Sequence, residues 1–317
     1  MTGRTPYCGD GERVDHRYRN DLFYAHLSLY AFAARWAAGA RVLDVGCGTG
    51  YGSAYLRRHG AGAVTGLDLD SSAVRAATEQ FAGDGVGFAV ADAGALPTAA
   101  AAYGVIVALN ALEHVRDVRG FLRRACDALA PGGTLIAAVP PVTSPEQRLA
   151  ELANPYHLHI WTPQQWRLMV APFFAEVQVF RHDVAAKGAV PDFRNTPEQT
   201  RMRESDFAFR PLTGSAQLRG SLSVVLVASG PLAPDVRPSA DRPVRLVGGS
   251  LSRDRPPRLV PLAPDELAAP LRPAGELPSA LLRAAADGGL AGMARSVRSW
   301  AAWRMRRALA LRELRRG

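Results

Sequence analysis

A short apolar strand that runs straight into a glycine-rich turn constrains this chain more than any other feature. Over Val42–Gly52 the sequence reads Val-Leu-Asp-Val-Gly-Cys-Gly-Thr-Gly-Tyr-Gly. Glycine has no Cβ, so a turn built from glycines lets the backbone approach a bound ligand closely. A buried strand that leads through such a turn into a helix opens an α/β unit with a ligand crevice at the carboxyl end of the strand. The segment therefore predicts ligand binding at the end of the first strand.

The glycine spacing disfavours two common nucleotide-binding loops. A dinucleotide fingerprint reads Gly-x-Gly-x-x-Gly, whereas Gly46–Gly50 reads Gly-x-Gly-x-Gly, with Tyr51 where the third glycine of the fingerprint would stand. No Gly-Lys-Ser/Thr follows, so a Walker A phosphate loop is also disfavoured. Glycine turns follow strands in many α/β folds without binding a ligand, but here Asp44 precedes the turn at the same time. The combination favours a ligand other than a dinucleotide.

Short β-branched runs alternate with helical stretches through the first half of the chain, which is typical of a parallel sheet with crossover helices. We expect strands at Arg41–Val45, Ala63–Leu67, Val86–Val90, Gly104–Leu109 and Thr134–Val139. We expect helices at Asn20–Ala37, Tyr51–His59, Ser71–Phe81 and Val118–Ala130, the last ended by the Pro-Gly-Gly of residues 131–133. These elements predict a doubly wound, Rossmann-like α/β fold.

The second half of the chain is less regular. Pro163–Val170 is expected to form a helix, and Glu176–Phe180 and Leu222–Ala228 are expected to pair as the antiparallel end of the sheet. The sheet would then have seven strands, most of them parallel. Residues 182–220 are polar and rich in arginine, and we expect them to form an insertion over the carboxyl edge of the sheet.

Charge and composition divide the chain into three parts. The chain carries a net charge of +9, of which residues 232–317 contribute +8, from 16 Arg against 8 acidic residues. We expect a main domain over residues 1–230, a largely disordered Pro/Arg-rich linker over 231–280 and a basic amphipathic helix over 281–317. That helix could pack on its own domain, lie on an anionic membrane, or contact a protein or nucleic acid. The main domain is nearly neutral, which disfavours nucleic acid as its substrate.

Further polar residues follow the later strands. Asp68 lies 24 residues after Asp44, at the carboxyl end of the second strand, where a carboxylate can accept hydrogen bonds from both ribose hydroxyls. Asp92 and Ala93 follow the third strand and suit the exocyclic amine and ring edge of an adenine. Asn110 follows the fourth strand. Both aspartates could instead be ordinary turn residues, which are common after strands.

Residues 41–139 resemble the class I S-adenosylmethionine-dependent methyltransferases. The resemblance rests on the glycine turn, on the acidic residue at 68, on Asp-Ala-x-x-Leu-Pro at 92–97, on Leu-Glu-His-Val at 112–115 and on Ala-Pro-Gly-Gly-Thr-Leu at 130–135. It implies that the turn holds the methionine part of S-adenosylmethionine, that Asp68 holds the ribose, and that Asp92 with Ala93 holds the adenine. Asn110 would approach the methionine end. The set expected to bind the cofactor is Asp44, Gly46, Cys47, Gly48, Gly50, Asp68, Leu69, Asp92, Ala93 and Asn110.

A narrower resemblance covers residues 11–230 and is to bacterial methyltransferases encoded with glycan and natural-product pathways. It rests on Gly11–Arg13, His26 and Tyr30–Ala34 before the first strand, and on Asn-Pro-Tyr-His-Leu-His at 154–159 after the fifth. It implies an O-methyltransferase whose acceptor is a hydroxyl of a sugar or of another small metabolite. The alternative is a protein that binds S-adenosylmethionine without turnover and acts as a regulatory or scaffold subunit.

Methyl transfer from a sulfonium to a hydroxyl is an in-line displacement that often needs a base to remove the hydroxyl proton. Histidine suits this task near neutral pH, and the candidate bases are His114, His157 and His159. Each could instead anchor a loop or pack at the start of a helix. No metal site is expected, because the histidine pair at 157 and 159 has no carboxylate cluster near it in the sequence.

Two further expectations concern the target and the compartment. DNA amino-methyltransferases carry Asn/Asp-Pro-Pro-Tyr/Phe after the fourth strand, whereas residues 110–113 read Asn-Ala-Leu-Glu, so DNA is not the expected substrate. Three scattered cysteines, Cys8, Cys47 and Cys126, favour a reducing cytoplasm over a disulfide-stabilised fold. No apolar run approaches the roughly 20 residues of a membrane span, so membrane contact, if any, is expected to be peripheral, at the inner face and through the basic helix.

Overall fold

The computed structural model describes residues 14, 16–96, 101–143, 147–148, 151, 154, 156–185, 191, 197, 199–212, 221–237, 244–247 and 258–261. Its centre is an eight-stranded sheet in the order β3-β2-β1-β4-β5-β8-β6-β7. The strands are β1 (Arg41–Val45), β2 (Ala63–Asp68), β3 (Val86–Val90), β4 (Tyr103–Leu109), β5 (Leu129–Val139), β6 (Phe174–Val184), β7 (Phe207–Pro211) and β8 (Ser223–Pro231). Strands β1 to β5 are parallel to one another. Strand β8 pairs antiparallel with β5, β6 pairs antiparallel with β8, and β7 pairs antiparallel with β6, so β8 and β7 run opposite to the parallel strands.

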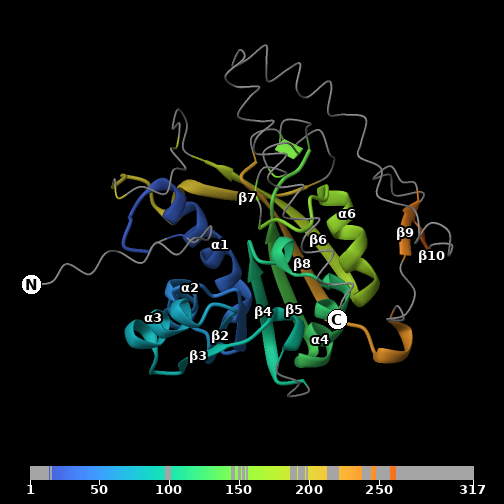
Figure 1. Cartoon of the computed structure of the whole chain (residues 1–317), viewed down its shortest axis with the longest axis horizontal. Helices are drawn as coiled ribbons and strands as arrows, with labels where there is room; N and C mark the ends of the chain where they lie inside the picture. Colours follow the sequence, from blue (N-terminus) through green and yellow to red (C-terminus); the bar gives the residue numbers. More distant parts are fainter. Residues whose placement is uncertain are drawn as a thin grey trace, which may run out of the picture.

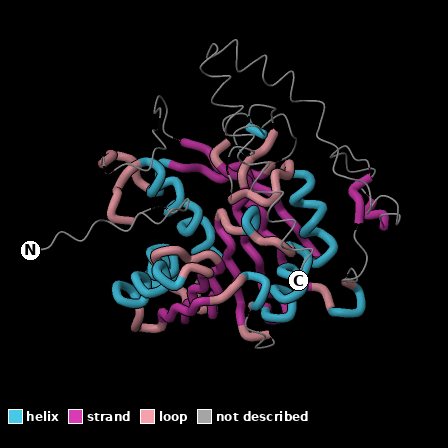
Figure 2. The backbone as a smooth tube through the Cα atoms, viewed as in Figure 1, coloured by secondary structure: helices cyan, strands magenta, loops and turns pink. Residues whose placement is uncertain are grey.

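Helices cover both faces of the sheet, as Figures 1 and 2 show. They are α1 (Asp21–Ala37), α2 (Tyr51–Arg58), α3 (Ser71–Phe81), α4 (Val118–Ala128) and α6 (Pro163–Val170). The first three lie on one face, and α4 and α6 lie on the other (Figure 1). This arrangement confirms the predicted doubly wound, Rossmann-like α/β class.

Alternating burial along the central strands explains why the sheet has a core on each side. In β4, Val105 and Val107 pack with α1 and α2, while Ile106 and Ala108 pack with α4 and α6. Successive side chains of a strand point to opposite faces, and here both faces are apolar. The near-continuous apolar runs in the central strands are therefore typical of a sheet buried on both sides.

The sheet has eight strands rather than the seven predicted. The additional strand, β7, pairs with β6 from Val184↔Phe207 to Phe180↔Pro211 at the edge of the sheet. It comes from the segment expected to form an insertion. Buried Phe207 and half-buried Phe209 give a short period-2 pattern, which the surrounding arginines hide in the sequence. Pro211 is compatible with this position because an edge strand leaves some N–H groups without a ladder partner.

The start of β5 also differs from the prediction. Helix α4 ends at Ala128 and β5 begins at Leu129, so the Pro-Gly-Gly of residues 131–133 lies inside the strand and does not precede it. The pairing of β4 with β5 shifts register between Tyr103 and Val105, opposite this segment. Gly132 has a φ of +75°, which suits glycine, so the prolyl-glycine sequence marks an irregular strand start.

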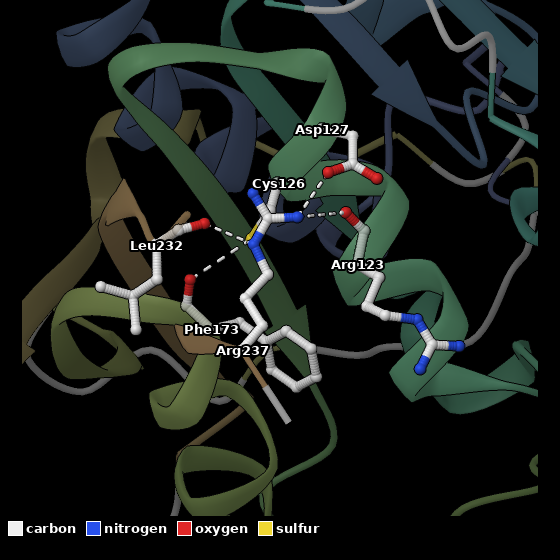
Figure 3. Close-up of polar contacts among 6 residues, drawn as sticks. All are labelled: Arg123, Cys126, Asp127, Phe173, Leu232 and Arg237. Carbon is white, nitrogen blue, oxygen red and sulfur yellow. Dashed lines mark hydrogen bonds and ion pairs between the residues drawn. The ribbon is translucent and has the colours of Figure 1, made fainter. Parts of the chain in front are cut away.

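A cluster of polar contacts fastens the segment after β8 to helix α4 (Figure 3). The guanidinium of Arg237 forms an ion pair with Asp127 and donates to the carbonyl of Leu232. It also reaches the carbonyl of Arg123 at 3.4 Å. Beside it, the Cys126 thiol donates to the carbonyl of Phe173 at 3.3 Å. The contacts of the fold therefore extend to residue 237, beyond the boundary expected at 230.

Part of the expected linker forms regular structure. Strand β9 (Val244–Val247) pairs antiparallel with β10 (Arg258–Pro261) in a separate two-stranded sheet. The other linker residues from 238 onward, and the whole basic helix expected over 281–317, lie outside the described residues. Among the described helices, none combines the length and the apolar character needed to cross a membrane.

Candidate functional site

The carboxyl ends of β1 to β4 meet at one edge of the sheet. Asp44 is paired with Gly66 of β2, Val107 lies across from Asp44 in β4, and Asp68 is paired with Val90 of β3. The parallel register thus carries the glycine turn, Asp68, the Asp92 turn and Asn110 to the same edge. Open α/β sheets bind ligands in the crevice outside this edge.

The glycine turn is held by backbone hydrogen bonds to the end of β2. The amides of Gly46 and Cys47 both donate to the carbonyl of Leu67, at 2.8 and 2.9 Å. The amide of Gly48 donates to Oδ2 of Asp68 at 2.9 Å. The turn and the acidic residue predicted to bind the ribose therefore form one hydrogen-bonded unit.

The three glycines of the turn have different surroundings. All have positive φ, between +53° and +82°. A Cβ on Gly46 would lie 2.9 Å from that of Ala111, and one on Gly50 would lie 2.7 Å from the ring of Phe88. A Cβ on Gly48 would meet nothing within 4 Å. Gly46 and Gly50 are therefore needed for packing, whereas Gly48 lies where the turn is open to a ligand.

Asp68 lies next to exposed apolar surface. Besides Gly48, its carboxylate accepts from the amide of Asp70 at 3.0 Å through Oδ1. A carboxylate has about four lone-pair sites, which lets one side chain accept from several donors, such as the two hydroxyls of a diol. Leu69 is 70% exposed and Val90 is 53% exposed. Exposed apolar side chains next to a carboxylate suit a ligand with a flat ring and a diol.

Asp92 and Ala93 lie at the start of a short 3-10 helix, η1 (Ala93–Ala95). The carboxylate of Asp92 caps this helix by accepting from the amide of Gly94 at 2.6 Å. Asp92 is exposed. Ala93 is partly buried against the core on the α4 side. From the sequence, Asp92 could be a turn residue or a ligand of adenine. The structure shows that its carboxylate caps η1, at the same edge of the sheet as the glycine turn.

Asp44 and Cys47 lie inside the fold. The Cys47 side chain is buried, and its thiol lies 3.8 Å from the carbonyl of Gly48 in the turn. Asp44 is fully buried, and its carboxylate accepts from Ser53 Oγ at 2.6 Å and from Tyr30 Oη at 3.3 Å. Tyr30 belongs to α1 and Ser53 to α2. The acid before the turn thus joins two helices beneath it.

Burial raises the pKa of Asp44 from 3.8 to about 7, although the hydrogen bonds from Ser53 and Tyr30 oppose the rise. Because its pKa is higher in the folded than in the unfolded state, the protonated carboxyl of Asp44 contributes fully to the free energy of unfolding below about pH 4. This contribution is lost as the pH rises toward 7. Between pH 5 and pH 8 we expect Asp44 to lower the free energy of unfolding by roughly 2–3 kcal/mol. Urea denaturation without cofactor at the two pH values measures this.

The matched variant for that experiment is Asp44→Asn, which keeps an acceptor for Ser53 but does not ionise. It should lose most of the difference between pH 5 and pH 8. Equal pH dependence in the variant and the wild-type chain would contradict the assigned burial of the charge. The unfolding slope in urea should stay the same, because the surface exposed on unfolding does not change.

Asn110 adopts a left-handed backbone at the end of β4, with φ of +53°. Its amide donates to the carbonyl of Ala138 at 2.9 Å. Its side-chain Nδ2 lies 3.3 Å from Nε2 of His26, on helix α1. Non-glycine residues in this conformation concentrate at functional sites, where the surrounding structure holds them. His26 was noted in the sequence only as part of a family resemblance, and here it reaches the ligand edge.

The turn after β4 is fastened to the segment that follows β5. The carbonyl of Glu113 accepts from the amides of Leu158 and His159, at 2.8 and 3.2 Å. His114 Nδ1 donates to the carbonyl of Tyr156 at 3.0 Å, and His159 Nε2 donates to the carbonyl of Val115 at 2.8 Å. Four hydrogen bonds thus join η2 (Leu112–His114) to the segment that carries the predicted histidines.

The structure brings two of the three candidate bases together and separates the third. The rings of His114 and His157 lie 4.9 Å apart in an edge-to-face arrangement, and Nδ1 of His157 pairs with the Glu151 carboxylate. The ring of His159 packs instead against Trp161 at 4.4 Å and Trp166 at 6.3 Å. His157 and His159 therefore have different partners, although alternation in an extended segment predicted a common direction.

One group of described residues has the spacing of a cation site. Glu113, His114 and His157 each place one nitrogen or carboxylate oxygen so that the three atoms lie within 4.8 Å of one another. Glu113 is only 1% exposed. This set differs from the pair at 157 and 159 considered in the sequence, because the buried carboxylate comes from the turn after β4.

Glu151 and His16 are the site residues that sequence reasoning missed. Glu151 precedes His157 by six residues, a separation that matches neither a helical nor a strand period. His16 Nδ1 lies 3.1 Å from Oγ1 of Thr49, inside the glycine turn, and its ring packs edge-on against Phe81 at 5.5 Å. The contacts of His16 join segments far apart in the chain, which leave no local signal in the sequence. The pair of Glu151 and His157 leaves none because its spacing fits no regular element.

Residues 43–137 match a family model described as a methyltransferase domain. The ubiquinone biosynthesis O-methyltransferase of Methylobacterium sp. (strain 4-46) is 35% identical over 140 residues, which cover 43% of this chain and 55% of that relative. The protein of the same name from Methylocella silvestris is 32% identical over 166 residues, covering 49% of this chain and 64% of the relative. The chain thus spans about half to two thirds of the length of these curated relatives.

The crystal structure of an S-adenosylmethionine-dependent methyltransferase from Thermotoga maritima is similar in fold. It has a TM-score of 0.50 and 17% sequence identity, and the likeness covers 65% of this chain and 90% of that one. At this identity the likeness concerns the fold alone.

Proposed function

We propose that this chain, which carries the methyltransferase domain of the class I S-adenosylmethionine-dependent enzymes, transfers a methyl group from S-adenosylmethionine to a hydroxyl oxygen of a small molecule. The observation that carries the proposal is the meeting of two sets of groups at one sheet edge. The glycine turn with Asp68 forms one set, and the histidines after β4 and β5 form the other. A Cβ on Gly46 would lie 2.9 Å from that of Ala111, three residues before His114, which supports the proximity of the two sets.

The residues at this edge fit the cofactor. Open space over Gly48 leaves room for the methionine part, and the acceptor capacity of Asp68 suits the ribose hydroxyls. The exposed side chains of Leu69 and Val90 suit the adenine ring, with Asp92 nearby to accept from its amine. When bound, S-adenosylmethionine supplies an electrophilic methyl group on a sulfonium. The protein then has to position the acceptor and remove its proton.

The choice of oxygen as the methylated atom is supported by two observations. The curated relatives are named O-methyltransferases, and two histidine rings that could remove the proton of a hydroxyl, His114 and His157, pack together on the segments after β4 and β5. The sequence resemblance favours a sugar or another hydroxylated metabolite as the acceptor. Incubating the chain with S-adenosylmethionine and a panel of sugar, phenol and catechol hydroxyls, followed by mass spectrometry, tests this by the mass gain of one methyl group.

The rival function is cofactor binding without turnover. A protein of that kind needs the glycine turn and Asp68 but has no use for an oriented histidine. The pairing of His157 with a carboxylate therefore favours an enzyme. Binding of S-adenosylmethionine with no methylated product from any hydroxyl in the panel would favour the rival.

Replacement of Asp68 with alanine should weaken S-adenosylmethionine binding by about 1.5–3 kcal/mol, because hydrogen bonds to a charged group are lost. The amide of Gly48 would lose its acceptor as well. Isothermal titration calorimetry of the wild-type chain and the variant measures the change. Glu79→Ala on α3 is the matched control, since it removes an exposed carboxylate from the same face and should leave binding unchanged. Equal affinity of all three proteins would overturn the assignment of Asp68.

We place the reaction in the cytoplasm, since Cys47 and Cys126 are free and buried thiols. The basic segment over 281–317 would then bring the enzyme to anionic lipid at the inner membrane face. Co-sedimentation of the full chain with phosphatidylserine vesicles at low salt should show binding that 0.5 M salt abolishes. Absence of the chain from the vesicle pellet at low salt would rule this location out.

A further inference from the structure

We propose that Glu151 and His157 act as a carboxylate–imidazole pair, in which Glu151 orients His157 and His157 removes the proton of the acceptor hydroxyl. The proposal rests on the proposed methyl transfer and names its base. Glu151 does not touch the reacting atoms, so it is a positioning residue, whereas His157 is the catalytic one. The pair is formed by Nδ1 of His157 and Oε2 of Glu151.

The hydrogen bond to Glu151 determines which nitrogen of His157 can act as a base. An ionised carboxylate only accepts hydrogen bonds, so Nδ1 must carry the proton. The lone pair of the neutral ring then lies on Nε2, on the opposite side of the imidazole. The His157 side chain is 9% exposed and that of Glu151 is 22% exposed. Bulk water therefore screens this pair less than it screens a surface pair.

The position of His157 is fixed from several sides. Its neighbours Tyr156 and Leu158 are held by His114 Nδ1 and by the carbonyl of Glu113. The turn that carries these two groups begins beside Ala111, whose side chain limits Gly46 of the cofactor turn to a glycine. These hydrogen bonds tie the segment of His157 to the turn after β4, which starts at the ligand edge. A base must be held in this way to meet the acceptor in a reactive geometry.

The other two histidines have partners that suit a structural role. His159 uses Nε2 to donate to the carbonyl of Val115 and packs on two tryptophans. His114 donates through Nδ1 to the carbonyl of Tyr156, which orients the ring. His157 pairs through Nδ1 with the Glu151 carboxylate, the arrangement that stabilises an imidazolium during catalysis.

The proton and bond changes balance within this site. The acceptor O–H gives its proton to Nε2 of His157 while the oxygen forms a bond to the methyl carbon. The methyl–sulfur bond breaks, its electron pair stays on sulfur, and S-adenosylhomocysteine leaves. The imidazolium is stabilised by the charge of Glu151 and returns the proton to solvent after product release. Among the residues that the structure describes, Glu113, His114 and Glu151 are charged or titratable groups close to His157.

The first test reads the tautomer of His157 without any acceptor. Histidine-¹⁵N NMR of the full chain, with the His157 signals assigned from His157→Gln, should show Nδ1 protonated in the neutral ring. Glu151→Gln should reduce the population of this tautomer, and Glu151→Asp should restore most of it. Glu176→Gln, on the exposed face of β6, is the matched control and should change nothing. A tautomer that Glu151→Gln leaves unchanged overturns the proposal.

The second test uses an acceptor that the wild-type chain methylates. Glu151→Gln should lower kcat roughly 10–100-fold with little change in KM, and the acidic limb of the pH–rate profile should move to lower pH. A merely structural role would change stability and KM but not the limb. If the methyl-transfer proposal is wrong, the wild-type chain will give no methylated product. The NMR test of the Glu151–His157 pair does not depend on turnover, so its result distinguishes the two failures.

A bound cation is the outcome that would replace the pair. If EDTA abolishes activity, and Zn²⁺ or Mn²⁺ restores it while shifting the signals of both His114 and His157, then His157 is a ligand and the proposal is wrong. Turnover that EDTA leaves unchanged, together with the tautomer change in Glu151→Gln, supports the pair.

Discussion

Replacement of Gly52 by alanine is expected to destabilise the fold by about 3 kcal/mol or more, because the new methyl group has no space. An added Cβ would lie 2.0–2.3 Å from three atoms of the Tyr30 ring. Tyr30 is 5% exposed and donates to Asp44, so it cannot move without breaking that hydrogen bond. In an ordinary helix the same substitution would stabilise by about 1 kcal/mol. Urea denaturation of the two proteins measures the difference.

Two further variants separate the clash from a general effect of alanine. Gly87 on β3 has no atom within 4 Å of an added Cβ, so Gly87→Ala should change stability by less than about 0.5 kcal/mol. Tyr30→Ala makes space beside Gly52, so the double variant should be far less destabilised than the sum of the single changes. Wild-type stability in Gly52→Ala would mean that Tyr30 does not lie over the helix start.

The same glycine shows where sequence reasoning ends. The sequence predicts a ligand loop and assigns Gly46, Gly48 and Gly50 to the cofactor. In the structure an added Cβ at Gly48 would meet no other atom within 4 Å. At the other three glycines an added Cβ would clash with a side chain from another element: Ala111 at Gly46, Phe88 at Gly50 and Tyr30 at Gly52. A sequence gives the spacing of glycines but not which side chain from another element packs on each one.

The parallel half of the fold could be predicted because its signals are local. Strands β1 to β4 and helices α1 to α3 lie within a residue or two of the expected ranges, since apolar runs and capping residues mark them. Asp70, for example, caps α3 by accepting from the amide of Ser72 at 2.7 Å. The antiparallel end was harder. Strand β7 depends on pairing with β6, which is a non-local contact.

The site was predictable only in part for the same reason. Sheet topology brings Asp68 and Gly48 together, so their neighbourhood could be inferred from the order of the strands. The histidines lie on turns and loops, and their orientation depends on hydrogen bonds between η2 and the segment after β5. Alternation predicted that His157 and His159 point the same way, but the bond from His159 to Val115 turns it toward the tryptophans.

Replacement of His157 by glutamine is expected to lower kcat roughly 10²–10⁴-fold, the usual contribution of a general base. Glutamine keeps a polar side chain of similar length but cannot take up a proton near neutral pH. Affinity for S-adenosylmethionine should change little, because the ribose ligand and the open part of the turn are Asp68 and Gly48. Turnover and calorimetry on the same preparation separate the two effects.

The matched control is His59→Gln at the exposed end of α2, where the ring stacks on Tyr55 at 3.7 Å. It should keep the kcat of the wild-type chain, because His59 follows the last turn of α2, at the opposite end of the helix from the glycine turn. His159→Gln is informative in another way: losing its bond to Val115 should lower the melting temperature. If instead His157→Gln kept the wild-type kcat and its pH profile, another group would have to accept the proton of the acceptor hydroxyl. His26, hydrogen-bonded to Asn110 at the same edge, would then be the next residue to replace.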